Sequence, residues 1–158
     1  MAKEISVNKS NLKIIVDDDD YAFLSLFVWK LFKKRVQPYS YHYGKIVRPH
    51  RLVLKLENSA IIVDHKNGNT LDNRKENLRI CSNKENSRNI GKRKGKYTSE
   101  YKGINKNNSG NWVARICTDS GRVYLGTFNS EQEAAIAYNE AAKKYHKEFA
   151  NYVEVSNG

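Results

Sequence analysis

The chain has 158 residues, enough for one ordinary domain or two small ones, and two small units would leave no room for a large enclosed cavity. Its 28 Lys and Arg residues outnumber its 17 Asp and Glu residues, and the net charge of +11 favours a nucleic acid partner over a membrane surface. There is no run of about 18 apolar residues and no signal-peptide layout, so we expect an intracellular protein that does not cross a membrane. The two isolated cysteines, Cys81 and Cys117, indicate neither a disulfide framework nor a thiolate zinc site.

The first part of the chain predicts a small mixed unit. Strands are expected at 12–16, 27–32 and 39–43, where aromatic and β-branched residues are frequent, and a short helix at 50–56. The acidic run Asp17–Asp20 precedes an apolar helix, so capping of that helix by Asp17 is favoured over metal binding. His50 stands at the start of the second helix. It could contact a phosphate there or pack within the protein, and the sequence favours neither role.

A group of polar residues follows in residues 58–89. The apolar strand 60–63 ends in Asp64 and His65, and a polar loop of about a dozen residues leads to a second strand at 78–81. Ser82 and Glu85 have the capping-box spacing, which predicts a helix through about residue 89. A long structureless loop inside a compact unit is usually functional. The sequence therefore predicts a strand–loop–strand–helix unit whose polar residues converge.

These residues resemble the HNH nuclease signature, which is built on the ββα-metal motif. The resemblance rests on Asp64-His65, on Asn77 in Glu-Asn-Leu-Arg, and on Asn86 in the helix. The flanking His-Arg-Leu-Val and Asp-His-x-x-Gly-Asn stretches are similar to the variant of phage and intron-borne homing endonucleases, in which Asn86 stands at the last His of the name. A metal-dependent DNA endonuclease is the expectation that follows.

The chemistry of phosphodiester hydrolysis agrees with these residue types. Asp64 and Asn86 offer hard oxygen ligands for one Mg²⁺ or Mn²⁺ ion per active site, with water and phosphate completing the shell. His65 points to the opposite face of the strand from Asp64 and can act as the general base on water. Asn77 is expected to hold the imidazole by a hydrogen bond, and Asn73 is a weaker candidate for that role. The alternative is that these residues are turn formers around a solvated loop histidine.

Residues 90–99 read as a basic linker. Two glycines and four cations stand there with almost no apolar residue. Lys92, Arg93, Lys94 and Lys96 could each add a salt-sensitive phosphate contact along a duplex, and a merely solvated linker is the alternative.

Residues 100–153 predict a sheet packed on one helix. Strands at 101–105, 111–117 and 122–128 alternate and are separated by Gly-containing turns, and the Ser130–Glu133 capping box opens an Ala-rich helix that ends near residue 145. Ile104, Trp112, Ala114, Ile116, Val123 and Leu125 are expected on the face that packs on the helix. The other face is cationic and aromatic, which suits entry into a major groove.

This segment resembles the plant ethylene-response-factor (APETALA2-type) DNA-binding domain over nearly its whole length. The matching stretches are Tyr-Lys-Gly-Ile, Trp-Val-Ala-Arg-Ile, Tyr-Leu-Gly-Thr-Phe and Glu-Ala-Ala-x-Ala-Tyr-Asn-x-Ala-Ala. Several arginines and a tryptophan of the plant pattern are Asn, Ser or Cys here, so the plant target sequence does not carry over. The resemblance implies DNA-facing positions for Lys102, Asn105, Asn107, Arg115, Arg122 and Tyr124.

The sequence thus predicts an α+β protein with two modules. Residues 1–89 form an HNH nuclease domain, with the ββα-metal core at about 58–89, and a three-stranded antiparallel sheet packed on one helix forms the second module. We expect double-stranded DNA to be nicked or cleaved, in a homing role implied by the resemblance alone, with no obligatory protein partner evident. A non-catalytic, sequence-specific DNA-binding regulator is the alternative, and an RNA-directed protein is disfavoured because no RNA-stacking motif is recognisable.

Overall fold

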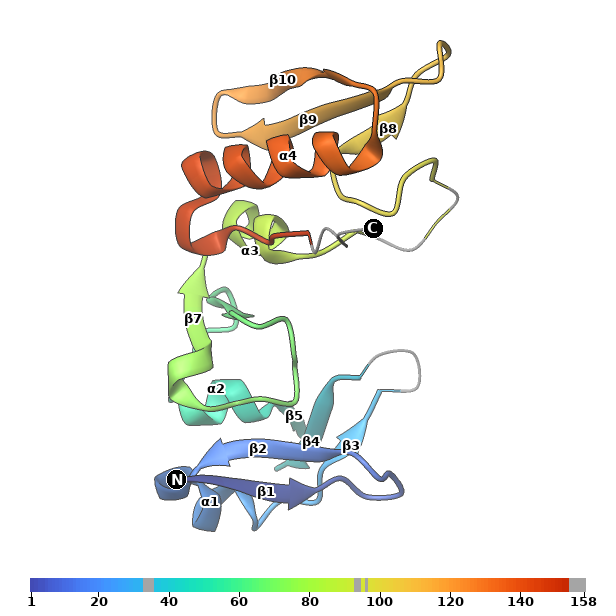
Figure 1. Ribbon diagram of the computed structural model, residues 1–158. Coiled ribbons are helices and arrows are strands. Elements are labelled where there is room, and N and C mark those ends of the chain that lie inside the picture. Colours follow the sequence, from blue (N-terminus) through green and yellow to red (C-terminus); the bar gives the residue numbers. More distant parts are fainter. Residues whose placement is uncertain (33–35, 93–94, 96, 154–158) are drawn as a thin grey trace. The chain divides into compact units, whose positions relative to one another are not determined.

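The protein is an α+β protein built from short helices and several small sheets, as its sequence predicts (Figure 1). The computed structural model describes residues 1–32, 36–92, 95 and 97–153. The chain divides into two compact units, Met1–Asn83 and Lys84–Gly158. This division lies at the start of helix α3 (Asn83–Asn89), ahead of the boundary after residue 89 that the sequence suggests.

The first unit begins with two antiparallel strands and a helix. Strand β1 (Ala2–Ser6) pairs with β2 (Lys13–Asp17), and α1 (Asp18–Leu24) follows directly. Asp17 occupies the N-cap position of α1 as predicted, but its side chain makes no capping hydrogen bond. Its Oδ2 instead accepts from the backbone nitrogen of Lys75, 2.8 Å away, so the acidic residue ties the helix start to the loop that precedes β7 (Leu78–Cys81).

The second sheet of this unit is shorter than the sequence suggests. Its strands, in spatial order, are β3 (Lys30–Leu31), β4 (Pro38–His42) and β5 (Lys45–Val47), and the helix α2 (Pro49–Val53) comes next. A strand over 27–32 was expected, but only two residues pair. The reason is Trp29, which is 1% exposed and donates its indole Nε1–H to the carbonyl oxygen of Leu24. Packing of this ring holds the segment in a loop.

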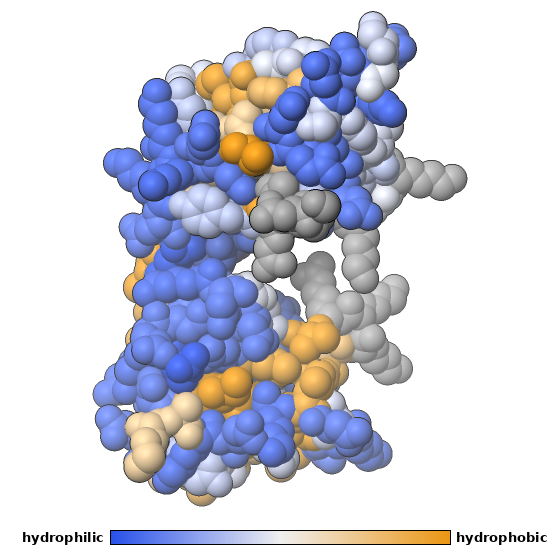
Figure 2. Space-filling view, viewed as in Figure 1, coloured by the Kyte–Doolittle hydropathy of each residue, from blue (hydrophilic) through white to orange (hydrophobic). Residues whose placement is uncertain are grey.

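One hydrophobic cluster holds the first unit together. It joins residues from β1, β2, α1, α2 and the chain around β7, namely Ile5, Val7, Ile14, Val16, Leu24, Trp29, Val53, Leu71 and Leu78. The surface is mostly hydrophilic, as the blue colour in Figure 2 shows for the visible side. The polar residues of the expected site thus lie on a scaffold whose core is complete without them.

A two-stranded antiparallel sheet carries Asp64 and His65 of the expected nuclease site. β6 (Ile62–His65) pairs with β7, and the 3₁₀ turn η1 (Lys75–Asn77) leads into the second strand. Asp64 and His65 are the last two residues of β6 itself. Asp64 lies opposite Arg79 in the register, and His65 lies opposite Leu78.

The second unit packs a helix on one face of a three-stranded antiparallel sheet. The strands are β8 (Ile104–Lys106), β9 (Trp112–Thr118) and β10 (Gly121–Phe128), with β9 in the middle, and the helix is α4 (Glu131–His146), followed by the 3₁₀ turn η2 (Lys147–Phe149). Ser130 caps α4, and its Oγ accepts from the backbone nitrogen of Glu133 at 3.1 Å. Ile104, Ala114 and Ile116 are buried against four alanines and Tyr138 of the helix. Among the described residues, no helix is long and apolar enough to cross a membrane.

Candidate active site and nucleic-acid interface

Asp64 is a buried carboxylate that is paired with the guanidinium of Arg79. The side chain of the facing residue, Arg79, donates from Nε and Nη2 to the same carboxylate oxygen, Oδ2, at 2.9 and 2.7 Å. Both side chains are less than 10% exposed. The pair aligns the carboxylate and offsets part of the cost of burying its charge. Arg79 was not singled out from the sequence, although pairing of the two predicted strands brings it opposite Asp64.

His65 is held by Asn73, and this hydrogen bond fixes which ring nitrogen carries the proton. Asn73 is fully buried, and its Nδ2 donates to the carbonyl oxygens of Thr70 and Leu71 at 3.2 and 3.0 Å. The amide oxygen Oδ1 is therefore the atom that faces the imidazole, 3.3 Å from Nε2. Because an amide oxygen only accepts, Nε2 is the protonated nitrogen and Nδ1 carries the basic lone pair.

Burial keeps the imidazole of His65 neutral. His65 is 7% exposed, and burial lowers its pKa, against the smaller raising effects of the hydrogen bond to Asn73 and the charge of Asp64. A second histidine, His50 of α2, lies edge-on to it, with ring centroids 5.4 Å apart. Burial above all, with a smaller effect of the Arg48 and Arg51 charges, lowers the pKa of His50 to about 3. Both rings are therefore uncharged at neutral pH, and His65 is in the form that a general base requires.

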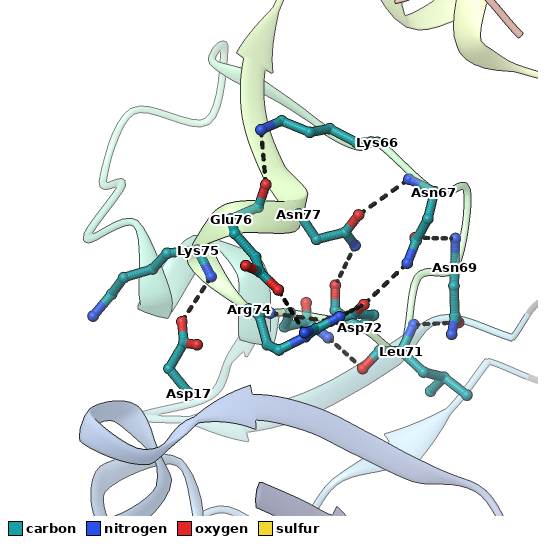
Figure 3. Close-up of polar contacts among 11 residues, drawn as sticks. Asp17, Lys66, Asn67, Asn69, Leu71, Asp72, Arg74, Lys75, Glu76 and Asn77 are labelled. Carbon is teal, nitrogen blue, oxygen red and sulfur yellow. Dashed lines mark hydrogen bonds and ion pairs between the residues drawn. The ribbon is translucent and has the colours of Figure 1, made fainter. Parts of the chain in front are cut away.

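Asn77 holds the polar loop that follows His65 in the chain (Figure 3). Its Oδ1 accepts from the backbone nitrogen of Asn67 at 3.0 Å, and its Nδ2 donates to the backbone oxygen of Asp72 at 2.7 Å. The sequence analysis expected Asn77 to orient the imidazole, with Asn73 as the weaker candidate. The imidazole contact described above belongs to Asn73, and a catalytic role for Asn77 stays a prediction.

Asp72 organises the loop from its centre, and the sequence analysis did not identify it. Its carboxylate is 2% exposed and accepts from Nε and Nη2 of Arg74, both at 2.8 Å, and from Nδ2 of Asn67 at 3.0 Å (Figure 3). These hydrogen bonds, those to Arg74 above all, lower the pKa of Asp72. The backbone on either side bonds to Ile15 of β2 at 2.8 and 2.7 Å. The polar loop is thus a rigid element rather than a loose connection.

The donor chemistry fits a hard divalent cation. Carboxylate and amide oxygens such as those of Asp64 and Asn86 are the ligands that Mg²⁺ and Mn²⁺ prefer. Among the described residues no group of three or more His, Cys, Asp and Glu side chains is gathered in a way that could hold a metal ion. Asn86 lies on α3, and all of this helix except its first residue belongs to the second unit. Its role beside Asp64 stays a prediction.

The second unit exposes a polar sheet face opposite α4. Four of the predicted DNA-facing residues, Asn105, Arg115, Arg122 and Tyr124, are exposed on its strands. The register places Arg115 opposite Tyr124, while Arg122 lies opposite Cys117 on the same face. The Tyr124 hydroxyl also shares a hydrogen bond with Thr127, at 2.7 Å. The face joins two guanidinium groups and an aromatic ring, which suits phosphate and base contacts.

Three other predicted DNA-binding residues have intramolecular partners. The Nζ of Lys102 donates to the backbone oxygens of Ser87, Arg88 and Ile90, and the Oδ1 of Asn107 accepts from two backbone nitrogens in its own turn. The Nζ of Lys92 donates to the carbonyl oxygen of Tyr101 at 3.0 Å, and burial lowers its pKa. The linker cations Arg93, Lys94 and Lys96 lie outside the described residues. DNA contacts by all six residues stay predictions.

Comparison with known proteins shows to which family the chain belongs. Residues 39–88 match the family model described as HNH endonuclease. An uncharacterised HNH endonuclease of Acanthamoeba polyphaga mimivirus is 31% identical over 137 residues, which are 84% of this chain and 70% of that protein. The chain therefore belongs to the HNH endonuclease family, whose members generally use a divalent metal ion.

The C-terminal part has a second group of relatives. Dehydration-responsive element-binding protein 2C of Arabidopsis thaliana is 44% identical over 62 residues, and an AP2/ERF and B3 domain-containing transcription factor of the same plant is 43% identical over 54. These matches cover 37% and 34% of this chain but only 18% and 15% of the plant proteins. No solved structure is significantly similar to the chain.

Proposed function

We propose that the protein is a metal-dependent endonuclease that hydrolyses phosphodiester bonds of double-stranded DNA. The observation that carries the proposal is the buried, neutral His65, whose Nε2 faces the amide oxygen of Asn73, so that Nδ1 carries the basic lone pair. It lies within the stretch that matches the HNH family and next to a buried carboxylate.

In the proposed reaction, Nδ1 of His65 takes a proton from a water molecule, and the resulting hydroxide attacks phosphorus. The bond between phosphorus and the 3′ oxygen breaks, and the leaving oxygen takes a proton from solvent, so the products are a 5′-phosphate and a 3′-hydroxyl. Asp64 and Asn86 would hold one Mg²⁺ or Mn²⁺ ion, and the chemistry that it would supply is neutralisation of charge on the scissile phosphate. Because the tautomer of His65 is fixed before the reaction, no free energy is spent during it on placing the lone pair that accepts the proton.

The sheet face of the second unit supplies affinity for the duplex in this proposal. Arg115 and Arg122 contact phosphate or guanine edges, and Asn105 and Tyr124 add sequence preference. The plant relatives, whose printed names describe transcription factors and an element-binding protein, support a DNA-binding role for this region. One active site per chain makes one strand cut per binding event, so a monomer nicks DNA and a double-strand cut takes two visits or two chains.

The biological role that we propose is homing of a mobile element, as in phage and intron-borne nucleases. This part of the proposal is supported only by the resemblance of the His-Arg-Leu-Val and Asp-His-x-x-Gly-Asn stretches to those enzymes.

Supercoiled plasmid provides the test. The protein is incubated with plasmid and Mg²⁺ or Mn²⁺, beside an EDTA control and an Asp64→Ala variant whose duplex binding is measured in parallel. We expect metal-dependent nicks that DNA ligase reseals, because resealing requires a 5′-phosphate next to a 3′-hydroxyl. Duplex binding without nicking under any of these conditions would contradict the proposal and favour the non-catalytic regulator.

A further inference from the structure

Helix α3 has no hydrophobic face to hold it in place. Its seven residues, Asn83–Asn89, include no apolar side chain. An isolated helix shorter than about 12 residues is marginal in water, and Asn and Ser are weak helix formers. The order of α3 therefore depends on polar contacts with the residues around it.

Lys102 makes such a contact at the C-terminal end of the helix. Its ammonium donates to the backbone oxygens of Ser87, Arg88 and Ile90 at 2.8, 3.0 and 2.6 Å. The last carbonyls of a helix have no partner within the helix and carry its negative dipole end, so a cation placed there is stabilising. Lys102 precedes β8 in the sheet module, which makes this a tie between that module and α3.

A salt bridge makes a second tie. Nη2 of Arg88, on α3, lies 2.7 Å from Oδ1 of Asp119, in the turn between β9 and β10. The Arg88 side chain is 14% exposed, and its guanidinium lowers the pKa of Asp119. The two ties reach α3 from two places in the sheet module, one just before β8 and one in the turn between β9 and β10.

We propose that Lys102 and the Arg88–Asp119 pair are positioning residues for the nuclease, and that the sheet module orders the helix that carries Asn86. The inference rests on the proposed function in one respect, the role of Asn86 as a metal ligand. The backbone that Lys102 holds begins at Ser87, the residue after Asn86. The resemblance to the plant domain implies that Lys102 faces DNA. In the structure its ammonium instead binds the backbone at the C-terminal end of α3.

The test compares Lys102→Met with Lys102→Arg, Asp119→Asn and a control, Lys143→Met, in the full chain. Lys143 is an exposed lysine of α4 with the same charge, so its variant reports the loss of one positive charge alone. Without DNA, hydrogen exchange of the peptide that covers residues 83–90 is measured first. The Mn²⁺ concentration that gives half-maximal plasmid nicking is measured next, together with duplex affinity and the same quantities for Asn86→Ala.

We expect exchange in α3 to rise about tenfold in Lys102→Met, the effect of losing charge-assisted hydrogen bonds, and to rise less in Asp119→Asn. Lys102→Arg and Lys143→Met should resemble the wild type. The Mn²⁺ concentration that gives half-maximal nicking should likewise rise most in Lys102→Met and less in Asp119→Asn. Unchanged exchange together with weaker duplex binding in Lys102→Met would overturn the inference and make Lys102 a DNA contact.

Two further outcomes separate this inference from the proposed function. If exchange rises in Lys102→Met while its Mn²⁺ requirement stays unchanged and that of Asn86→Ala rises, the positioning role is overturned and the ligand role stands. If Asn86→Ala has the wild-type Mn²⁺ requirement, the ligand role fails, and the positioning inference for the metal falls with it although α3 is still held by Lys102.

Discussion

At the scale of single residues, the hydrogen bond between His65 and Asn73 fixes the tautomer of the imidazole. The two amide hydrogens of Asn73 are committed to Thr70 and Leu71, so its oxygen can only accept from the imidazole. A histidine held this way has its proton on Nε2 before substrate arrives. A buried ring without such a partner would distribute its proton between both nitrogens and lose part of its reactivity.

The first prediction concerns Asn73. In Asn73→Ala the tautomer and orientation of His65 are no longer fixed, and we expect kcat for nicking to fall about 10- to 100-fold with little change in duplex affinity. The free energy of unfolding should also fall by about 1–3 kcal/mol, because the carbonyls of Thr70 and Leu71 each lose a donor. Asn69→Ala is the matched control: Asn69 is exposed, and its Oδ1 accepts from the backbone nitrogen of Leu71 in the same turn. Equal kcat in the two variants would show that the His65 contact has no catalytic effect.

The second prediction concerns acid stability. The pKa of His50 is about 3 in the folded protein and 6.5 is its ordinary value, so the unfolded chain binds more protons between these values. The stabilising contribution of neutral His50 is complete above pH 6.5 and is lost as the pH falls toward 3. We expect the free energy of unfolding of the first unit to drop by up to about 1.4 kcal/mol per pH unit for this group, and the drop to be smaller in His50→Gln. Urea titrations at pH 7 and pH 5, followed by Trp29 fluorescence in a Trp112→Phe background, measure it; identical pH slopes for both proteins would contradict the assignment.

At the scale of elements, close approach of the backbone fixes how the sheet of the second unit packs on α4. Gly103 has a φ of +78°, and a Cβ there would lie 2.4 Å from the carbonyl oxygen of Arg115 and 2.5 Å from the ring of Tyr138. Its own carbonyl accepts from the backbone nitrogen of Arg115. Only glycine meets both requirements at the start of β8.

The third prediction follows from this packing. Gly103→Ala combines a left-handed backbone with overpacking, so we expect it to lower the free energy of unfolding of the second unit by roughly 2–5 kcal/mol. Gly110→Ala is the control, since Gly110 has a φ of +87° with nothing within 4 Å of an added Cβ. Gly110→Ala should lower the free energy of unfolding only by the cost of a left-handed backbone at alanine, about 1–2 kcal/mol. Urea unfolding followed by Trp112 fluorescence compares them, and equal losses would contradict the packing argument.

The sequence predicted the elements better than the partners of individual side chains. β7 spans the residues expected from the apolar pattern of Leu78–Cys81, and Ser130 caps α4 as its spacing to Glu133 implies. The strand expected at 27–32 is mostly loop because tertiary packing of Trp29 outweighs local propensity. The partners of Asn73 and Lys102 depend on how a folded loop and a helix end meet other residues, and no spacing in the sequence encodes that.

At the scale of the whole molecule, we expect charge to govern binding to the proposed duplex substrate. The exposed sheet face carries Arg115 and Arg122, while α4 covers the opposite face. Phosphate contacts release counterions, so each one steepens the dependence of affinity on salt concentration.

The fourth prediction therefore concerns salt dependence. For each of Arg115→Ala and Arg122→Ala, we expect weaker duplex binding and a slope of log affinity against log salt reduced by about 0.9 where the arginine contacts a phosphate. Lys143→Ala, on the helix side, removes one charge away from the sheet face and should leave the slope nearly unchanged. Fluorescence anisotropy over a range of NaCl concentrations measures the slopes, and a larger change in Lys143→Ala than in the arginine variants would place the DNA on another surface.

Chemical rescue of His65 tests the central claim most directly. Under saturating DNA and metal, His65→Ala should lose nicking by about 10²- to 10⁴-fold while binding duplex normally, because it lacks the general base. Added imidazole should restore part of the rate, whereas His42→Ala, which removes an exposed histidine, should nick at the wild-type rate throughout. Nicking by His65→Ala at the wild-type rate without imidazole would contradict the account.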